Sequence, residues 1–139
     1  MVNKSIEAAQ QRGFFAEVMR VLLKELETDG FMKRQDLKTR ITYTPWVWPY
    51  QGVKALLAFS YLEGSLCELA IRFKNPRLPV LHLAPTGGVR YDDDPWGKEV
   101  CLRDDVYGAM REALPDACRE FLRQQGIKVS AEGRQFFEL

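Results

Sequence analysis

Histidine is the residue that this chain has least of. His82 is its single histidine, and it lies in an apolar run between Leu81 and Leu83. Any serine or cysteine nucleophile activated by histidine would have to use it. A structural histidine fits that setting better than a catalytic one, and no other catalytic motif is present. We therefore expect a protein that is not an enzyme and needs no cofactor.

Cysteine is also scarce, and long apolar runs are missing. Cys67, Cys101 and Cys118 are an odd, scattered set without CxxC spacing, which favours reduced thiols over a disulfide framework. Three such cysteines and one histidine do not have the spacing of zinc ligands. No apolar run reaches membrane-spanning length, and the first residues have no signal-peptide core. These absences predict a cytoplasmic protein without a metal site or membrane contact.

Two short segments carry only partial ligand motifs. The acidic run 92–94 does not show the alternating oxygen ligands of a calcium loop, so a solvated loop explains it better. The segment 86–88 is Thr-Gly-Gly, and it is followed by neither the lysine nor the helix of a phosphate loop. Neither segment enters the predicted site.

The chain does have the composition of one globular domain: of its 139 residues, 46% are hydrophobic and 28% are charged. Strand and helix patterns do not alternate regularly, which argues against a parallel sheet. We predict a single α+β domain over 1–139, with helices packed on a small antiparallel sheet. Six residues are predicted to be buried: Leu22, Leu56, Leu69, Ile71, Phe121 and Leu122.

Local patterns predict most elements of the first two thirds. Apolar residues at helical spacing indicate a helix over 5–28 that ends at Asp29-Gly30. A short basic helix is expected over 33–41. Period-two alternation indicates a strand over 66–74, and a partner strand is expected over 79–84. In the strand over 66–74, four residues are predicted to point inward: Cys67, Leu69, Ile71 and Phe73.

The segment 51–62 is consistent with two structures. Alanine and leucine dominate it and only Val53 is β-branched, which favours a buried helix. The alternative is a buried strand followed by a hairpin turn at Glu63-Gly64. We prefer the helix.

The last third, 89–139, is predicted to contain a long loop, a kinked helix pair and a C-terminal hairpin. Pro115 is expected to break or kink the first helix or to begin the second one, and Gly126 ends the second one. The hairpin would pair 127–129 with 135–139.

A candidate binding surface combines aromatic and basic residues. Trp46 and Trp48 project to one side of an extended chain, where they could anchor a partner or roof the core. The span 33–77 has eight basic and three acidic residues, a net charge of +5 in a chain whose total is +1. Such a span suits phosphate contacts or docking on an acidic protein. The predicted binding residues are Lys38, Arg40, Trp46, Trp48, Lys54, Arg72, Lys74 and Arg77.

The order of elements over 14–88 resembles a winged-helix domain. The segment RQDLKTRI is similar to the second helix of that fold, and VKALLAFSYLEGSL to its third, recognition-type helix. The segment ELAIRFKNPRLPVLHLAPTG is similar to the two wing strands. The resemblance implies DNA binding. The predicted third helix has few polar side chains for base edges, so phosphate contacts would dominate.

Two functions remain. The preferred one is a small non-catalytic protein-interaction module, of adaptor, immunity, chaperone or inhibitor type, that binds another protein with an acidic surface. The alternative is a winged-helix-type accessory protein that binds double-stranded DNA. The oligomeric state stays open.

Overall fold

A computed structural model describes residues 4–34, 41–43, 54–85, 89–94 and 103–138. Within these ranges the strands form one antiparallel sheet with the order β1-β2-β3-β4-β5. Three helices complete the domain, which confirms the predicted α+β class. The elements are α1 (Lys4–Thr28), β1 (Ile41–Tyr43), β2 (Ala55–Leu62), β3 (Ser65–Phe73), β4 (Leu81–Leu83), β5 (Val89–Tyr91), α2 (Asp104–Gln124) and α3 (Ala131–Phe137).

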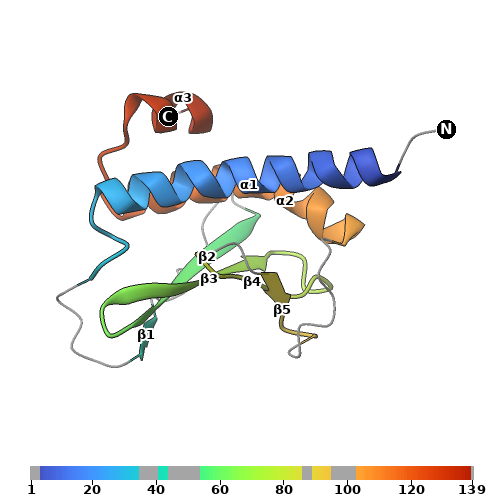
Figure 1. The fold of residues 1–139 in the computed structure, drawn as a ribbon, viewed down its shortest axis with the longest axis horizontal. Helices are drawn as coiled ribbons and strands as arrows, with labels where there is room; N and C mark the ends of the chain where they lie inside the picture. Colours follow the sequence, from blue (N-terminus) through green and yellow to red (C-terminus); the bar gives the residue numbers. More distant parts are fainter. Residues whose placement is uncertain (1–3, 35–40, 44–53, 86–88, 95–102, 139) are drawn as a thin grey trace.

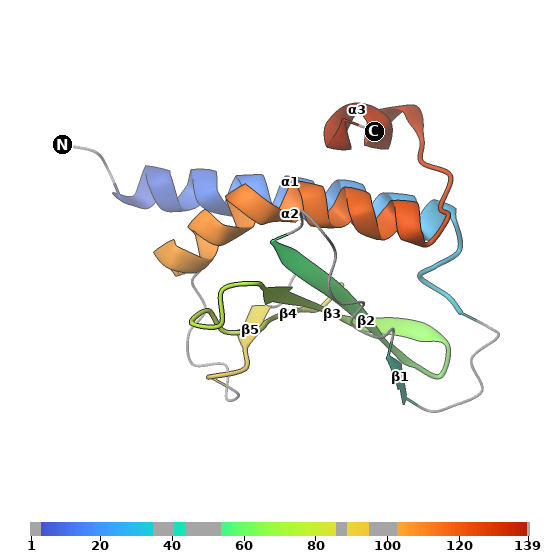
Figure 2. The ribbon, with the colours of Figure 1, turned by 180° about the vertical axis from the view of Figure 1, so that it is seen from behind.

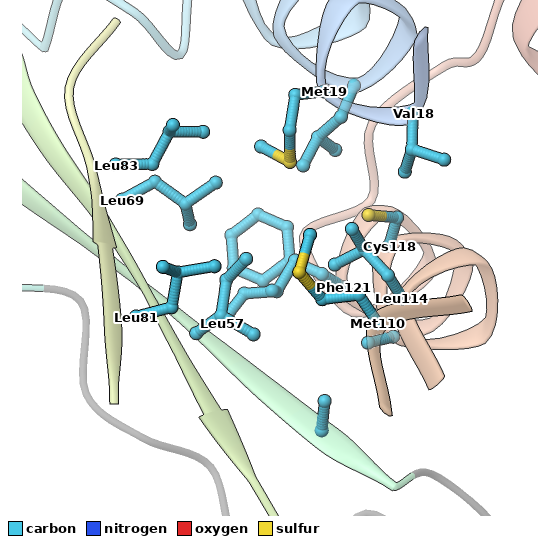
Figure 3. Close-up of a cluster of buried hydrophobic side chains, with 14 of the residues drawn as sticks. Val18, Met19, Leu57, Leu69, Leu81, Leu83, Met110, Leu114, Cys118 and Phe121 are labelled. Atoms are coloured by element: carbon cyan, nitrogen blue, oxygen red, sulfur yellow. The ribbon is translucent and has the colours of Figure 1, made fainter. Parts of the chain in front are cut away.

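The helices are arranged in layers on one side of the sheet. Figures 1 and 2 show α1 and α2 side by side over one sheet face, with α3 on the side of α1 away from the sheet. Side chains from α1, α2 and the sheet meet between these layers (Figure 3). All six residues predicted to be buried are at most 2% exposed. The residues labelled in Figure 3 are Val18, Met19, Leu57, Leu69, Leu81, Leu83, Met110, Leu114, Cys118 and Phe121.

The preferred helix over 51–62 is wrong in its described part, because Ala55–Leu62 form strand β2. This strand is buried on both faces. Leu57 and Phe59 belong to the core under the helices, whereas Leu56 and Ala58 are buried outside that cluster. A strand covered on both sides reads as a continuous apolar run rather than an alternating one. Its pattern therefore could not be distinguished from that of a buried helix.

The alternative hairpin between β2 and β3 is confirmed. Glu63 and Gly64 have φ values of 51° and 84°, so both central residues of the two-residue turn are left-handed. A side chain at Gly64 would also place its Cβ 2.9 Å from the carbonyl oxygen of Arg34. The turn thus requires glycine both for its conformation and for the close approach of residues 32–34.

Strand β3 carries a bulge that changes the predicted alternation. Its register shifts between Ser60 and Tyr61, so Cys67 is an extra residue between the pairs formed by Leu66 and Glu68. Cys67 is consequently exposed rather than inward. The other predicted inward residues, Leu69, Ile71 and Phe73, are buried, but Ala70 between them is buried as well; β4 pairs with β3 as expected.

The predicted second helix over 33–41 is wrong at both ends. Lys33 forms a bridge with Ser65, and Ile41 begins β1. Residues 35–40 lie outside the described residues.

Both helix ends that were assigned to glycine are confirmed. Gly30 and Gly126 have φ values of 82° and 67°. The N–H of Phe31 donates to Leu26, and that of Ile127 donates to Leu122, each across the last helical turn. These are the bonds of a Schellman motif, in which a left-handed glycine lets the chain turn back onto the helix.

The last third differs from its prediction in three places. Residues 89–91 form β5 inside the expected loop. Helix α2 is one continuous helix rather than a pair, and of the alternatives at Pro115 the kink is the one observed, since the two halves run in different directions (Figure 2). The expected hairpin is replaced by α3, whose N-terminus is capped by Ser130, because the hydroxyl accepts the N–H of Gly133 at 3.2 Å.

Candidate partner-binding groove

Four of the predicted binding residues come together at one end of the β2–β3 pair. Lys54 precedes β2, Arg72 lies near the end of β3, and Lys74 and Arg77 follow it; all four are exposed. The backbone N–H of Lys74 donates to the carbonyl of Lys54 at 2.8 Å, which joins the two strand ends. We call these four residues the basic end. Four other predicted residues lie outside the described residues: Lys38, Arg40, Trp46 and Trp48.

A groove of about 530 Å³ lies between this end of the sheet and α2. Phe73 and Leu78 line it from the sheet side, and Ala109 and Ala113 line it from α2. Two alanines one turn apart leave space that longer side chains would fill. The groove is therefore a consequence of small residues on one helical face opposite large apolar ones.

The polar groups at the groove are divided between its two sides. Lys54, Lys74 and Asn75 come from the strands and the following turn, whereas Asp105 and Glu112 come from α2. The ammonium group of Lys54 forms an ion pair with Glu112, and both side chains are 60% exposed. The sheet side is thus basic and the helix side acidic.

Three cations of the basic end have no such partner. In the part of the chain that the structure describes, no carboxylate forms an ion pair with Arg72, Lys74 or Arg77. All three side chains are exposed. Their charges are consequently available to a carboxylate or phosphate of another molecule.

His82 lies in a separate ionic cluster. Its Nδ1 is 3.2 Å from Glu68 Oε1, and Arg90 approaches the same oxygen at 3.0 Å. The geometry at Nδ1 does not qualify as a hydrogen bond. Cross-strand pairing of His82 with Ala70 and with Arg90 places this cluster over three neighbouring strands. The cluster contributes no residue to the groove.

The acidic run has structural contacts. Asp92 accepts the N–H of Val80 at 3.1 Å, and both carboxylate oxygens of Asp93 accept hydrogen bonds from Arg103. The hydrogen bonds from Arg103 lower the pKa of Asp93. Across the described ranges, no three histidine, cysteine or acidic side chains are grouped as metal ligands would be.

The two described thiols are in settings that disfavour a thiolate. Burial raises the pKa of Cys118 strongly, and burial followed by the charge of Glu68 raises the pKa of Cys67. A reactive cysteine needs a lowered pKa. Neither thiol is therefore a good candidate nucleophile.

Comparisons with protein-family models, with curated proteins and with solved structures found no match to this chain. None of the helices that the structure describes is both long and apolar enough to cross a membrane. The segment that the winged-helix resemblance assigns to a recognition helix forms β2, the hairpin turn and the first two residues of β3 in its described part. The resemblance as a whole stays a prediction, and the function must be argued from the groove and the basic end.

The sequence interpretation missed the helix side of the groove. Asp105, Ala109 and Ala113 recur every four residues, which places them on one face of α2. That spacing of small residues was available in the sequence. This face of α2 lies opposite Phe73 and Leu78, and that contact depends on how α2 packs against the sheet.

Proposed function

We propose that this protein is a small non-catalytic interaction module that binds another protein with an acidic surface through the basic end and the adjoining groove. The observation that supports this most is a set of three exposed cations, Arg72, Lys74 and Arg77, that have no ion-pair partner among the described residues. Lys74 lines an apolar groove, and the other two lie within three residues of it in the chain. Complementary charge steers a partner and orients it, while burial of an apolar anchor supplies affinity. The low cysteine content is in keeping with action in the cytoplasm.

Double-stranded DNA is the second candidate, since unpaired arginine and lysine residues also suit phosphates. The groove argues for a protein partner instead. Asp105 and Glu112 on its helix side would repel a phosphate backbone, and its Phe73 and Leu78 lining suits an apolar side chain. A duplex could contact the basic end only if it avoided α2.

The test is a triple charge reversal, Arg72→Glu with Lys74→Glu and Arg77→Glu. The control reverses three other exposed cations, Lys33, Lys128 and Arg134, and so changes the net charge equally. The tagged variants are used to capture partners from nuclease-treated extract, and binding to the identified partner is then measured across salt concentrations. We expect the first variant to lose the partner and the control to retain it.

Equal loss in both variants would contradict a localised site. DNA binding is measured in parallel by fluorescence anisotropy. If duplex DNA binds at low salt, and log K falls with log salt by about 0.9 per phosphate contact, the nucleic-acid alternative is supported instead. In that case the triple reversal should flatten the slope.

A further inference from the structure

We infer that the groove holds a short segment of the partner chain in which a large apolar side chain lies next to one or two carboxylates. This inference rests on the proposed function and specifies the kind of segment that is recognised. A volume of about 530 Å³ lies within the range of sites that hold one compact ligand group. Three features of the groove determine the chemistry of its occupant.

The first feature is the apolar lining. Phe73 is 6% exposed and Ala113 is 3% exposed, so each presents a small, apolar surface to the groove. Leu78 and Ala109 are half-buried and pack at the margin of the core. An aromatic or leucine side chain from a partner would remove this remaining apolar surface from water.

The second feature is the asymmetry of charge. Lys74 on the sheet side has no ion-pair partner among the described residues, whereas Asp105 and Glu112 on the helix side are acidic. A carboxylate next to the apolar anchor is attracted toward Lys74 and repelled from α2. The bound segment should therefore place its acidic residues over the β3 end and the turn, toward Arg77.

The third feature is the ion pair across the groove. Glu112 of α2 holds the ammonium group of Lys54, which comes from the strand side. A carboxylate of the partner can take the place of Glu112, because exposed ion pairs exchange at little cost. Glu112 is consequently an internal competitor, and its removal should strengthen binding of an acidic segment.

A defined peptide tests this inference without the native partner. The probe is acetyl-Gly-Phe-Asp-Glu-Gly-amide, titrated into the ¹⁵N-labelled full chain while amide shifts are followed by NMR. One control peptide has serine in place of phenylalanine, and a second has asparagine and glutamine in place of the two acids. We expect the probe to shift the amides of Leu78, Ala109 and Glu112, and both controls to bind at least about tenfold more weakly.

Variants of the chain locate the site. Ala109→Leu fills the groove and should weaken the probe at least about tenfold, whereas Ala16→Leu, at an exposed position of α1, should leave it unchanged. Lys74→Glu should also weaken binding of the probe. Because Lys74 is exposed, this variant changes the charge of the groove without disturbing the packing of the core. Glu112→Gln should strengthen it about threefold, while Asp116→Asn, one turn further along α2 and paired with Arg119, should not.

The outcomes separate the inference from the proposed function. Shifts outside the groove, equal binding of the three peptides, or unchanged binding to both Ala109→Leu and Lys74→Glu would overturn the inference. If the triple reversal still abolishes capture of the native partner, the proposed function stands without it. If the probe binds in the groove but the triple reversal leaves capture intact, the proposed function fails instead.

Discussion

The junction between α3 and α1 and the basic end of the β2–β3 pair are both rich in charge, but among the described residues the junction pairs its charges internally, whereas at the basic end only Lys54 has an ion-pair partner. At the junction, Glu132 forms ion pairs with Arg20 at 2.8 Å and with Lys24 at 2.7 Å. At the basic end, Arg72, Lys74 and Arg77 form none with the described residues. The ion pairs of the first region join α3 to α1, whereas Arg72, Lys74 and Arg77 are exposed to solvent.

A buried carboxylate, that of Glu25, also joins α1 to the start of α3. Glu25 is 2% exposed, and it accepts hydrogen bonds from both the N–H and the hydroxyl of Ser130, which is the N-cap of α3. A carboxylate buried this deeply would be costly without such donors. The junction is therefore a specific tertiary contact, whereas among the described residues the basic end contributes one exposed ion pair, between Lys54 and Glu112.

The largest expected effect follows from Gly133→Ala at the junction. An added Cβ would lie 2.5 Å from the Glu25 Oε1 and 2.6 Å from the Val129 Cγ1, so the buried Glu25 carboxylate, the Val129 side chain or α3 itself would have to shift. We expect the free energy of unfolding, measured by urea denaturation, to fall by about 1–3 kcal/mol. Gly13→Ala is the control, since nothing lies within 4 Å of its Cβ position in α1, and it should stabilise the protein by about 0.5–1 kcal/mol. A fully stable Gly133→Ala variant would show that α3 does not pack as described.

Ser130→Ala should have the next largest effect. It removes the N-cap bond to Gly133 and the hydroxyl bond to Glu25, so unfolding should become easier by about 0.5–2 kcal/mol. The same change at the exposed Ser65 should alter stability by about 0.5 kcal/mol or less. Equal effects at both positions would mean that the cap and its carboxylate partner do not hold the junction.

The double change Arg72→Ala with Lys74→Ala should leave stability within about 0.5 kcal/mol of the original protein, because neither side chain has an ion-pair partner among the described residues. Binding to the identified partner should nevertheless weaken by about 1.4 kcal/mol or more, which is tenfold. Calorimetry of binding and thermal unfolding of the same samples measure the two quantities. A large loss of stability with normal binding would assign the basic end to the fold.

The smallest expected effect is a pH dependence at the junction. Hydrogen bonds from Lys24 and Arg20 lower the pKa of Glu132 from 4.5 to about 2. Because this pKa is lower in the folded chain, the contribution of Glu132 is present above pH 4.5 and is lost as the pH falls toward 2. The melting temperature of the original protein should thus exceed that of Glu132→Gln slightly at pH 6, and the gap should close by pH 2. A gap that is constant with pH, or matched by the exposed control Glu27→Gln, would contradict the pairing.

Several features of the fold were predictable because their causes are local. The extent of α1 follows from the helical spacing of its apolar residues, and its end follows from a glycine that can be left-handed. The pairing of β3 with β4 follows from period-two alternation and the turn between them. Of the candidate site, the sequence indicated the cations of the basic end, since charge is a property of residue type. The sequence did not indicate that Lys54 and Lys74 line a groove.

Tertiary structure decided the rest, because the deciding contacts join distant residues. β2 is a strand despite its helix-favouring composition because it pairs with β3 along its whole length and is buried on both faces. The C-terminal residues form α3 rather than a hairpin, and Ser130 at its start bonds to Glu25, which is 105 positions earlier. The groove exists only where Ala109 and Ala113 of α2 meet Phe73 and Leu78. Residue types and their local spacing determined α1, α2, the turns and the charges, but packing between elements determined β2, α3 and the surfaces that these elements form.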